Sequence, residues 1–250
     1  MAKTIAVVNQ KGGVGKTTTC VNLTAALTES GKRVLLCDFD PQANSTSGMG
    51  IDKSTGIYEV ITGSMTVETA LAHTRFGDVL PSSGALAGAG IELIGVEHRE
   101  QTLKNALSGL DGKYDYILID CPPSLELLTL NALCAAESIL VPVQAEYFAL
   151  EGLSDLMNTV RLVRRGLNPR LELEGVLLTM YDGRTNLAAQ VADEVKRYFP
   201  GKVYATVIPR NVRLSEAPSH GQPITDYDPF CRGAIAYKEL AGEFLKQQRK

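Results

Sequence analysis

The chain has 250 residues, a formal net charge of −3 at pH 7 and 44% hydrophobic residues. This size suits a water-soluble globular protein, and no apolar run reaches the roughly 20 residues that a membrane-spanning helix needs. The five cysteines are odd in number and scattered, which argues against a disulfide framework or a metal site. The slight acidity excludes nucleic-acid binding through overall charge, so any such surface must be a local basic patch.

Short apolar runs and longer helical patterns alternate along the chain. Strands are predicted at residues 4–9, 34–38, 116–120, 139–142, 175–180 and 204–208. Helices are predicted near residues 17–30, 97–110, 126–135, 150–166, 185–198 and 232–247. The strands are continuous apolar runs, which is typical of a sheet covered by helices on both faces. We therefore expect one α/β domain over residues 1–250, with a doubly wound, mostly parallel sheet and ligands at the carboxyl ends of its strands.

The stretch from residue 41 to residue 96 departs from this alternation and is rich in Gly, Ser and Thr. We interpret it as a mobile crossover with short elements, and not as a second domain. Because the first predicted strand starts so close to residue 1, we also expect no signal peptide.

A glycine-rich loop joins the first predicted strand to the first predicted helix. Its sequence is Asn9-Gln10-Lys11-Gly12-Gly13-Val14-Gly15-Lys16-Thr17-Thr18-Thr19. Glycines remove side chains where the helix begins, so backbone N–H groups can face phosphate oxygens. Lys16 adds a positive charge for the β and γ phosphates, and the Thr17 hydroxyl is placed to ligate Mg²⁺. The usual phosphate-loop pattern has glycine where this chain has Gln10, so the match is to a variant that carries the additional lysine Lys11.

Three aspartates follow predicted strands on the side of this loop. Asp38 and Asp40 come at the end of one strand, and Asp120 ends another. A carboxylate in such a place can hold Mg²⁺ through a water molecule or respond to the γ-phosphate. An isolated aspartate there is more often a helix cap or a turn residue. Three of them beside one phosphate loop favour a nucleotide site.

Four segments together carry a family pattern. They are the phosphate loop with Lys11, residues 38–42 (Asp-Phe-Asp-Pro-Gln), residues 120–124 (Asp-Cys-Pro-Pro-Ser) and residues 207–219 (Val-Ile-Pro-Arg-Asn-Val-Arg-Leu-Ser-Glu-Ala-Pro-Ser). This combination resembles the ParA/Soj family of chromosome- and plasmid-partition ATPases, within the wider group of MinD and the nitrogenase iron protein. The resemblance extends over essentially the whole chain, in the short chromosomal form, and implies a P-loop NTPase fold.

The resemblance implies that ATP and Mg²⁺ are the cofactors. The expected ATP contacts are Lys11, Gly12, Gly13, Val14, Gly15, Lys16, Thr17, Thr18, Pro209 and Asn211, the last two at the adenine. Thr17 would ligate Mg²⁺, with Asp38 and Asp120 acting through water.

The catalytic residues that the resemblance implies are Lys11, Lys16 and Asp40. Lys11 would reach the ATP of a second subunit and stabilise the charge on the transferring phosphoryl group. Asp40 would position the attacking water.

The implied activity is a weak ATPase that works as a DNA-partitioning switch. ATP closes a homodimer, the dimer binds nonspecific double-stranded DNA, and a ParB/Spo0J-type centromere-binding protein stimulates hydrolysis and release. The family resemblance indicates Arg184 and Arg213 as the DNA contacts, and a few arginines suffice once two subunits combine them. We expect a cytoplasmic, nucleoid-associated protein with no membrane partner.

Other members of the superfamily provide alternative readings. A membrane regulator resembling MinD would carry an amphipathic C-terminal anchor, but Tyr237, Leu240 and Phe244 fit the core-facing stripe of an ordinary last helix. A redox protein resembling the nitrogenase iron protein would present cysteines to a cluster, and Cys121 and Cys134 are not placed for this. A tyrosine kinase would need a tyrosine-rich tail, which this sequence lacks.

Overall fold

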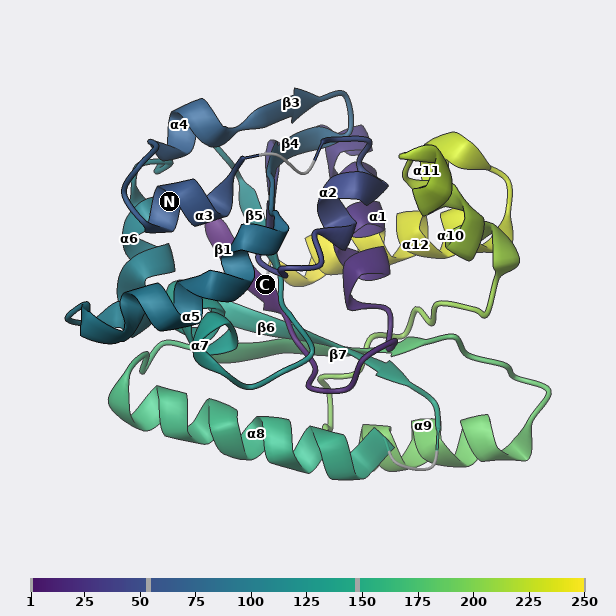
Figure 1. Cartoon of the computed structure of the whole chain (residues 1–250). Helices are drawn as coiled ribbons and strands as arrows, with labels where there is room; N and C mark the ends of the chain where they lie inside the picture. The colour runs from purple at the N-terminus through teal and green to yellow at the C-terminus, as the bar shows by residue number, and fades with distance from the viewer. Residues whose placement is uncertain (1, 53–54, 147–148, 250) are drawn as a thin grey trace.

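A computed structural model describes residues 2–52, 55–146 and 149–249 of the chain. Its centre is a seven-stranded sheet with the order β3-β4-β2-β5-β1-β6-β7 (Figure 1). Within this described part, β3 and β4 pair antiparallel and all other neighbours pair parallel. The strands are β1 Lys3–Val7, β2 Val34–Asp38, β3 Ala72–Thr74, β4 Gly77–Leu80, β5 Tyr116–Asp120, β6 Ser138–Gln144 and β7 Glu172–Thr179. The predicted fold class is confirmed.

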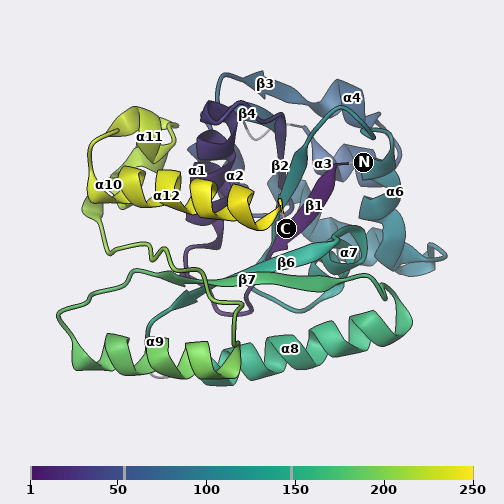
Figure 2. The same cartoon turned by 180° about the vertical axis from the view of Figure 1, so that it is seen from behind.

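Helices cover both faces of the sheet. They are α1 Lys16–Glu29, α2 Asn44–Gly48, α3 Ile57–Ile61, α4 Val67–Ala70, α5 Ala89–Glu92, α6 Thr102–Ser108, α7 Leu127–Ala135, α8 Ala149–Gly166, α9 Asn186–Tyr198, α10 Val212–Glu216, α11 Ile224–Tyr227 and α12 Arg232–Gln247. Figures 1 and 2 show α1 and α12 packed together on one side of the sheet, while α8 and α9 lie on the other. Each face thus has its own apolar core, one built with α1 and α10–α12 and the other with α3–α9.

Strand β1 shows why the predicted strands are continuous apolar runs. Ile5 and Val7 pack into the core beneath α1 and α12, whereas Ala6 and Val8 pack into the opposite core. Successive side chains of a strand point to opposite faces, so a sheet buried on both faces needs an apolar residue at every position.

Residues 41–96 contain more regular structure than the sequence indicates. The short helices α2–α5 lie there as expected, but β4 also pairs with the free edge of β2, and β3 folds back on β4. These two strands have four and three residues, which is too short for a periodic apolar pattern to identify them.

The predicted strand at residues 204–208 is wrong. Isolated parallel bridges to the β7 side of the sheet flank this segment at Val203 and Pro209, but no ladder forms across residues 204–208. The backbone amides of Ala205 and Thr206 donate to the Glu243 carboxylate of α12 at 2.8 and 2.9 Å. A side chain distant in the sequence therefore takes the amides that a strand would have used.

Helix boundaries also differ from prediction in places. The helix predicted near residues 97–110 begins as a 3₁₀ turn, Arg99–Gln101, and becomes α-helical only over Thr102–Ser108. The short helices α10 and α11, and the 3₁₀ turn Ala217–His220 between them, were not predicted. They are single turns, which give little periodic signal.

The final helix is a core helix, as its pattern predicts. Tyr237, Leu240 and Phe244 of α12 are buried against α1 and the sheet. In the described ranges, no helix is both long enough and apolar enough to cross a bilayer.

Candidate functional site

The glycine-rich loop leaves β1 at the carboxyl edge of the sheet and enters α1. Gly13 and Gly15 have φ angles of +74° and +88°, which are accessible to glycine without steric cost. Gly15 is the N-cap of α1, so the first amides of this helix open onto the loop. Unpaired amides at a helix N-terminus attract anions, and this backbone is therefore suited to a phosphate group.

Two polar residues that the sequence analysis missed brace this loop. The Asn9 side chain donates to the carbonyl of Pro142 at 2.8 Å and accepts from the backbone amide of Lys11 at 3.0 Å. The Thr179 hydroxyl, at the end of β7, donates to the carbonyl of Val14 at 2.8 Å. Both residues follow or end a parallel strand, which is the one signal that could have identified them.

Lys16 lies inside the site rather than at its surface. Its side chain is buried and its ammonium donates to the carbonyl of Lys11 at 3.2 Å. Burial lowers the pKa of Lys16, and the negative charges of Asp120 and Asp40 oppose that shift. The loop thus encloses one cation that faces carboxylates.

Asp38 and Asp120 end the neighbouring strands β2 and β5 as register partners. Burial raises the pKa of Asp38 to about 7 and that of Asp120 to about 6. Asp38 Oδ2 accepts from both the amide and the hydroxyl of Thr46 at 2.7 Å, and Asp120 Oδ2 accepts from the Ser45 hydroxyl at 2.6 Å. Helix α2 is therefore tied to two strand ends through contacts that the sequence analysis did not foresee.

One buried oxygen in this cluster is left over. Asp120 Oδ1 has no hydrogen-bond partner among the described residues, although the nearby Thr17 hydroxyl lowers the pKa of this carboxyl. Buried polar atoms are normally satisfied, and a carboxylate oxygen beside a hydroxyl is a donor set that suits Mg²⁺ or its bound water. Asp38 differs, because its Oδ1 accepts from the amide of Asp40 at 3.3 Å.

Helix α2 is also held from its far side. Gly50, just after α2, packs against Gly221, which follows the 3₁₀ turn Ala217–His220. A methyl group on Gly50 would lie 2.9 Å from the Gly221 carbonyl oxygen, and one on Gly221 would lie 2.7 Å from Gly50 Cα. The two backbones therefore touch with no room for a side chain.

A cavity of about 530 Å³ opens above the loop and unites segments far apart in the sequence. Its walls include six loop residues, Asp40 and the segment from Ile208 to Pro218. The lining residues that matter here are Gly12, Gly13, Gly15, Lys16, Thr17, Thr18, Asp40, Pro209 and Asn211. Most of the expected phosphate and adenine contacts thus lie on one cavity, with a volume suited to a nucleotide, whereas Val14 is buried away from its lining.

Asp40 and Asn211, which line this cavity, are both fixed by hydrogen bonds. Asp40 Oδ1 accepts from the amide of Gln42 at 2.9 Å, and the Ser82 hydroxyl donates to the Asp40 carbonyl at 2.8 Å. Asn211 is the N-cap of α10, and its Oδ1 accepts from the amide of Arg213 at 2.8 Å. The Asn211 oxygen is therefore already engaged, as a turn residue's would be.

Lys11 does not line the cavity. Its ammonium lies 3.0 Å from Glu146 Oε2 of the same chain, and both side chains are about half exposed. Gln144 donates to the other oxygen of Glu146. The role of Lys11 at a second subunit stays a prediction, and the structure adds Glu146 as the partner from which Lys11 would have to separate.

Arg184 and Arg213 come from different segments that meet beside the cavity. Tyr181 and Pro209 form an isolated parallel bridge, and each arginine follows its member of this bridge within four residues. Both guanidinium groups are paired with carboxylates of the same chain.

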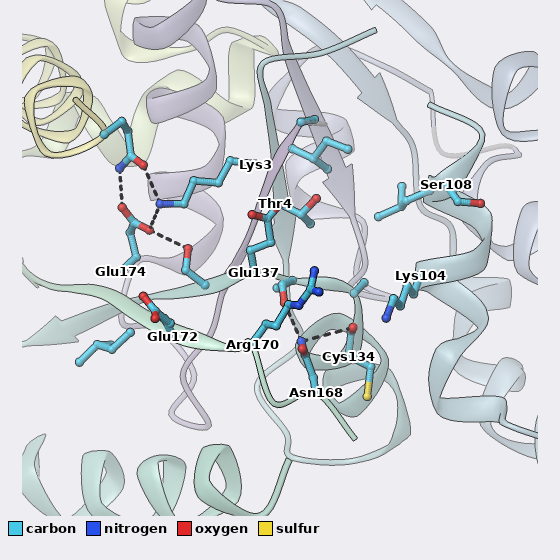
Figure 3. A pocket seen from close by; sticks show the side chains of 18 of the residues that line it. Lys3, Thr4, Lys104, Ser108, Cys134, Glu137, Asn168, Arg170, Glu172 and Glu174 are labelled. Carbon is cyan, nitrogen blue, oxygen red and sulfur yellow. Dashed lines mark hydrogen bonds and ion pairs between the residues drawn. The ribbon is translucent and has the colours of Figure 1, made fainter. Parts of the chain in front are cut away.

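A second cavity, of about 690 Å³, lies at the opposite, amino edge of the sheet (Figure 3). At one end of it Lys3 Nζ lies 2.6 Å from Glu174 Oε2, which also accepts from the Ser138 hydroxyl at 2.7 Å. Gln248 donates to the other oxygen of Glu174. Although burial opposes it, these three donors hold the pKa of Glu174 below its usual value.

Comparison with known proteins identifies the family of this chain. A family model described as an AAA domain matches residues 2–173. The sporulation initiation inhibitor protein Soj of Bacillus subtilis is 59% identical over 97% of this chain and 98% of its own. The chromosome-partitioning ATPase Soj of Treponema pallidum is 50% identical over 98% of both chains.

A solved structure also matches this chain along its whole length. The structure of cobyrinic acid a,c-diamide synthase from Mycobacterium smegmatis, with bound ADP and magnesium, has a TM-score of 0.89 and 40% identity. It covers 100% of this chain and 96% of its own. The names of these proteins differ, but the two Soj relatives match almost end to end at higher identity. The chain therefore belongs to the ParA/Soj family of chromosome-partitioning ATPases.

Proposed function

We propose that this protein is an ATP-dependent DNA-partitioning switch with weak intrinsic ATPase activity. ATP and Mg²⁺ bind at the glycine-rich loop, and the ATP state closes a homodimer. The dimer holds nonspecific double-stranded DNA, and a ParB-type centromere-binding protein triggers hydrolysis and release.

One observation carries the nucleotide part of this proposal. The loop amides, Lys16, Asp40 and the segment of Pro209 and Asn211 all line a single cavity. Lys16 would neutralise the β and γ phosphates, and the Asn211 Nδ2 group would donate to the base. A relative with ADP and magnesium bound adds support for this choice of ligands.

The same cavity supports hydrolysis of the γ-phosphate. Asp40 reaches the cavity from the end of β2, where its carboxylate can orient a water molecule for in-line attack. Lys16 and, from a second subunit, Lys11 would stabilise the charge on the transferring group. Thr17 and Asp120 would hold Mg²⁺, which supplies charge neutralisation at the phosphates. Asp120 Oδ1, for which the described residues supply no hydrogen-bond partner, is the feature that fits this cation.

The DNA part of the proposal depends on dimerisation. If each subunit contributes Arg184 and Arg213, a dimer presents twice as many phosphate contacts as one chain. Linked contacts strengthen binding without any new interaction, so DNA affinity follows the nucleotide state.

The first test is binding to random-sequence duplex DNA with no nucleotide, ADP, ATP or a slowly hydrolysed ATP analogue, across a salt series. We expect binding only in the ATP states, weakening steeply with salt because counterions are released. Sedimentation of the same samples reports the dimer.

Normal ATP-driven dimers without DNA binding in any state would contradict the proposal. Binding to anionic liposomes would then favour a membrane regulator of the same superfamily. Equal DNA binding in all nucleotide states would refute the switch while leaving the DNA surface intact.

A further inference from the structure

Arg184 forms an ion pair with Asp182, a carboxylate in the same turn. Its Nε and Nη2 atoms donate to Asp182 Oδ1 and Oδ2 at 2.8 and 2.7 Å, which is a bidentate pair. The Arg184 amide also donates to Asp182 Oδ1 at 3.1 Å. The hydrogen bonds from Arg184 hold the pKa of Asp182 at about 2, so this carboxyl is ionised at every physiological pH.

Arg213 is held in a similar way, with two carboxylates instead of one. Its Nη1 donates to Glu216 Oε2 at 2.8 Å, and its Nε lies 3.5 Å from Asp228 Oδ2. The Tyr227 hydroxyl donates to the same Glu216 oxygen at 3.3 Å, which fixes the carboxylate in place. Neither arginine is buried, since 89% of the Arg184 side chain and 54% of the Arg213 side chain are exposed.

A carboxylate and a phosphate compete for the same fork of guanidinium donors. Both present two oxygens at the spacing that bidentate pairing requires. Counterions condensed on DNA are released when a cationic side chain neutralises a phosphate. An arginine that is already paired with a carboxylate has a local charge near zero, so it releases fewer of these counterions. Solvent-exposed ion pairs are weak, so such a pair lowers DNA affinity without preventing binding.

We propose that Asp182 and Glu216 are built-in competitors that keep the DNA affinity of one chain low. In one chain these carboxylates outcompete DNA phosphates for the guanidinium groups. In a dimer the phosphate contacts of two chains add up and displace the carboxylates, so DNA binding depends more steeply on dimerisation. This inference rests on the proposed DNA role of Arg184 and Arg213. It concerns a pair of acidic residues that the sequence analysis did not single out.

The test compares Asp182→Asn with a charge-matched control, Asp193→Asn. Asparagine keeps the Oδ1 acceptor for the Arg184 amide, so the turn before α9 persists while the competing charge is removed. Asp193 is exposed on α9 and forms no ion pair among the described residues. Fluorescence anisotropy with random-sequence duplex DNA and the ATP analogue, across a salt series, gives both affinity and salt dependence.

We expect Asp182→Asn to tighten DNA binding about three- to tenfold at low salt. The slope of log affinity against log salt should also become steeper by about 2 per dimer, one unit for each freed arginine. Asp193→Asn should change neither. Adding Arg184→Gln to Asp182→Asn should cancel the gain, because the freed fork is then gone.

The outcomes separate this inference from the proposed function. Wild-type protein that binds no DNA in any nucleotide state would overturn the proposed function itself. Wild-type protein that binds DNA in the ATP state, with Asp182→Asn equal to it in affinity and slope, would overturn the inference alone. If Asp182→Asn fails to dimerise with ATP, Glu216→Gln applies the same test to Arg213.

Discussion

The two edges of the sheet each carry a cavity and at least one buried carboxylate, but the surroundings shift the pKa values of these carboxylates in opposite directions. At the amino edge, Glu174 is fully paired with Lys3, Ser138 and Gln248 (Figure 3), and its pKa is lowered. At the carboxyl edge, Asp38 and Asp120 are register partners with raised pKa values, and Asp120 Oδ1 has no hydrogen-bond partner within the part of the chain that the structure describes.

The difference separates a structural cluster from a ligand site. A network in which every polar atom is hydrogen-bonded stabilises the fold and offers no unpaired group to a ligand. An unsatisfied one costs free energy until a ligand supplies the missing partner, which is why perturbed carboxyls gather at functional sites. Cavity size alone would have favoured the wrong edge, since the amino-edge cavity is the larger.

Substituting the lysine at each edge of the sheet should give the largest difference between the two edges. Lys16→Ala should weaken ATP binding about a hundredfold or more, because a charged contact to the phosphates is lost in a buried site. Lys3→Ala, at the amino edge, is the matched control and should bind ATP normally while losing stability. Titration with a fluorescent ATP analogue measures both. Equal loss of affinity in the two variants would remove the distinction between the edges.

Aspartates give the second test. Asp40→Ala should bind ATP and dimerise but hydrolyse it about a hundredfold more slowly, because the attacking water loses its orienting carboxylate. The control is Asp111→Ala, which removes an acidic residue from the wall of the amino-edge cavity. Phosphate release under single-turnover conditions is the measurement. Rapid turnover by Asp40→Ala would contradict the catalytic assignment.

The smallest expected effects are changes in the free energy of unfolding, and they should have opposite signs at the two edges of the sheet. Glu174→Gln should lower the free energy of unfolding by about 2 kcal/mol, because it leaves Lys3 without its buried partner. Asp120→Asn should raise the stability of the nucleotide-free protein by about 1 kcal/mol, because it removes an ionisable group that burial disfavours. Urea unfolding at neutral pH compares the two, and changes of the same sign would refute the contrast.

The pH dependence sharpens this last comparison. The folded pKa of Asp120 lies above its unfolded value near 4, so the native state binds more protons and stability is lost as pH rises from about 4 to about 6. Glu174 has a lowered pKa, so its contribution is present at neutral pH and is lost as pH falls below about 4.5. Asp120→Asn should reduce the loss of stability between about pH 4 and about pH 6, and it should leave the loss of stability below about pH 4.5 unchanged.

The sequence indicated those parts of the site that are contiguous in the chain. Strands 34–38 and 116–120 match the structure at both ends, because their apolar runs stop at the aspartates of the candidate site. The glycine-rich loop was recognisable for the same reason, since one short segment supplies both its amides and its cation. Asp182 and Glu216 were visible beside their arginines but carried no signal of pairing.

Contacts between distant segments could not be predicted in this way. Thr179 holds the loop from a strand more than half the chain away, and Glu243 accepts from the backbone amides of Ala205 and Thr206, in the segment predicted as a strand. Neither residue has a neighbour in the sequence that reveals its partner. The expected roles of Lys11 and of the two arginines need a second molecule, so one chain leaves them as predictions.

The contact between Gly50 and Gly221 has a mechanical consequence. Helix α2 is hydrogen-bonded to Asp38 and Asp120 on one side. On the other side Gly50, just after α2, contacts Gly221 with no side chain between the two backbones. Gly221 follows the segment that carries Pro209, Asn211 and Arg213. Because no side chain separates the two backbones, we expect a displacement of α2 to move Gly221 as well, so that the two walls of the candidate cavity would shift together.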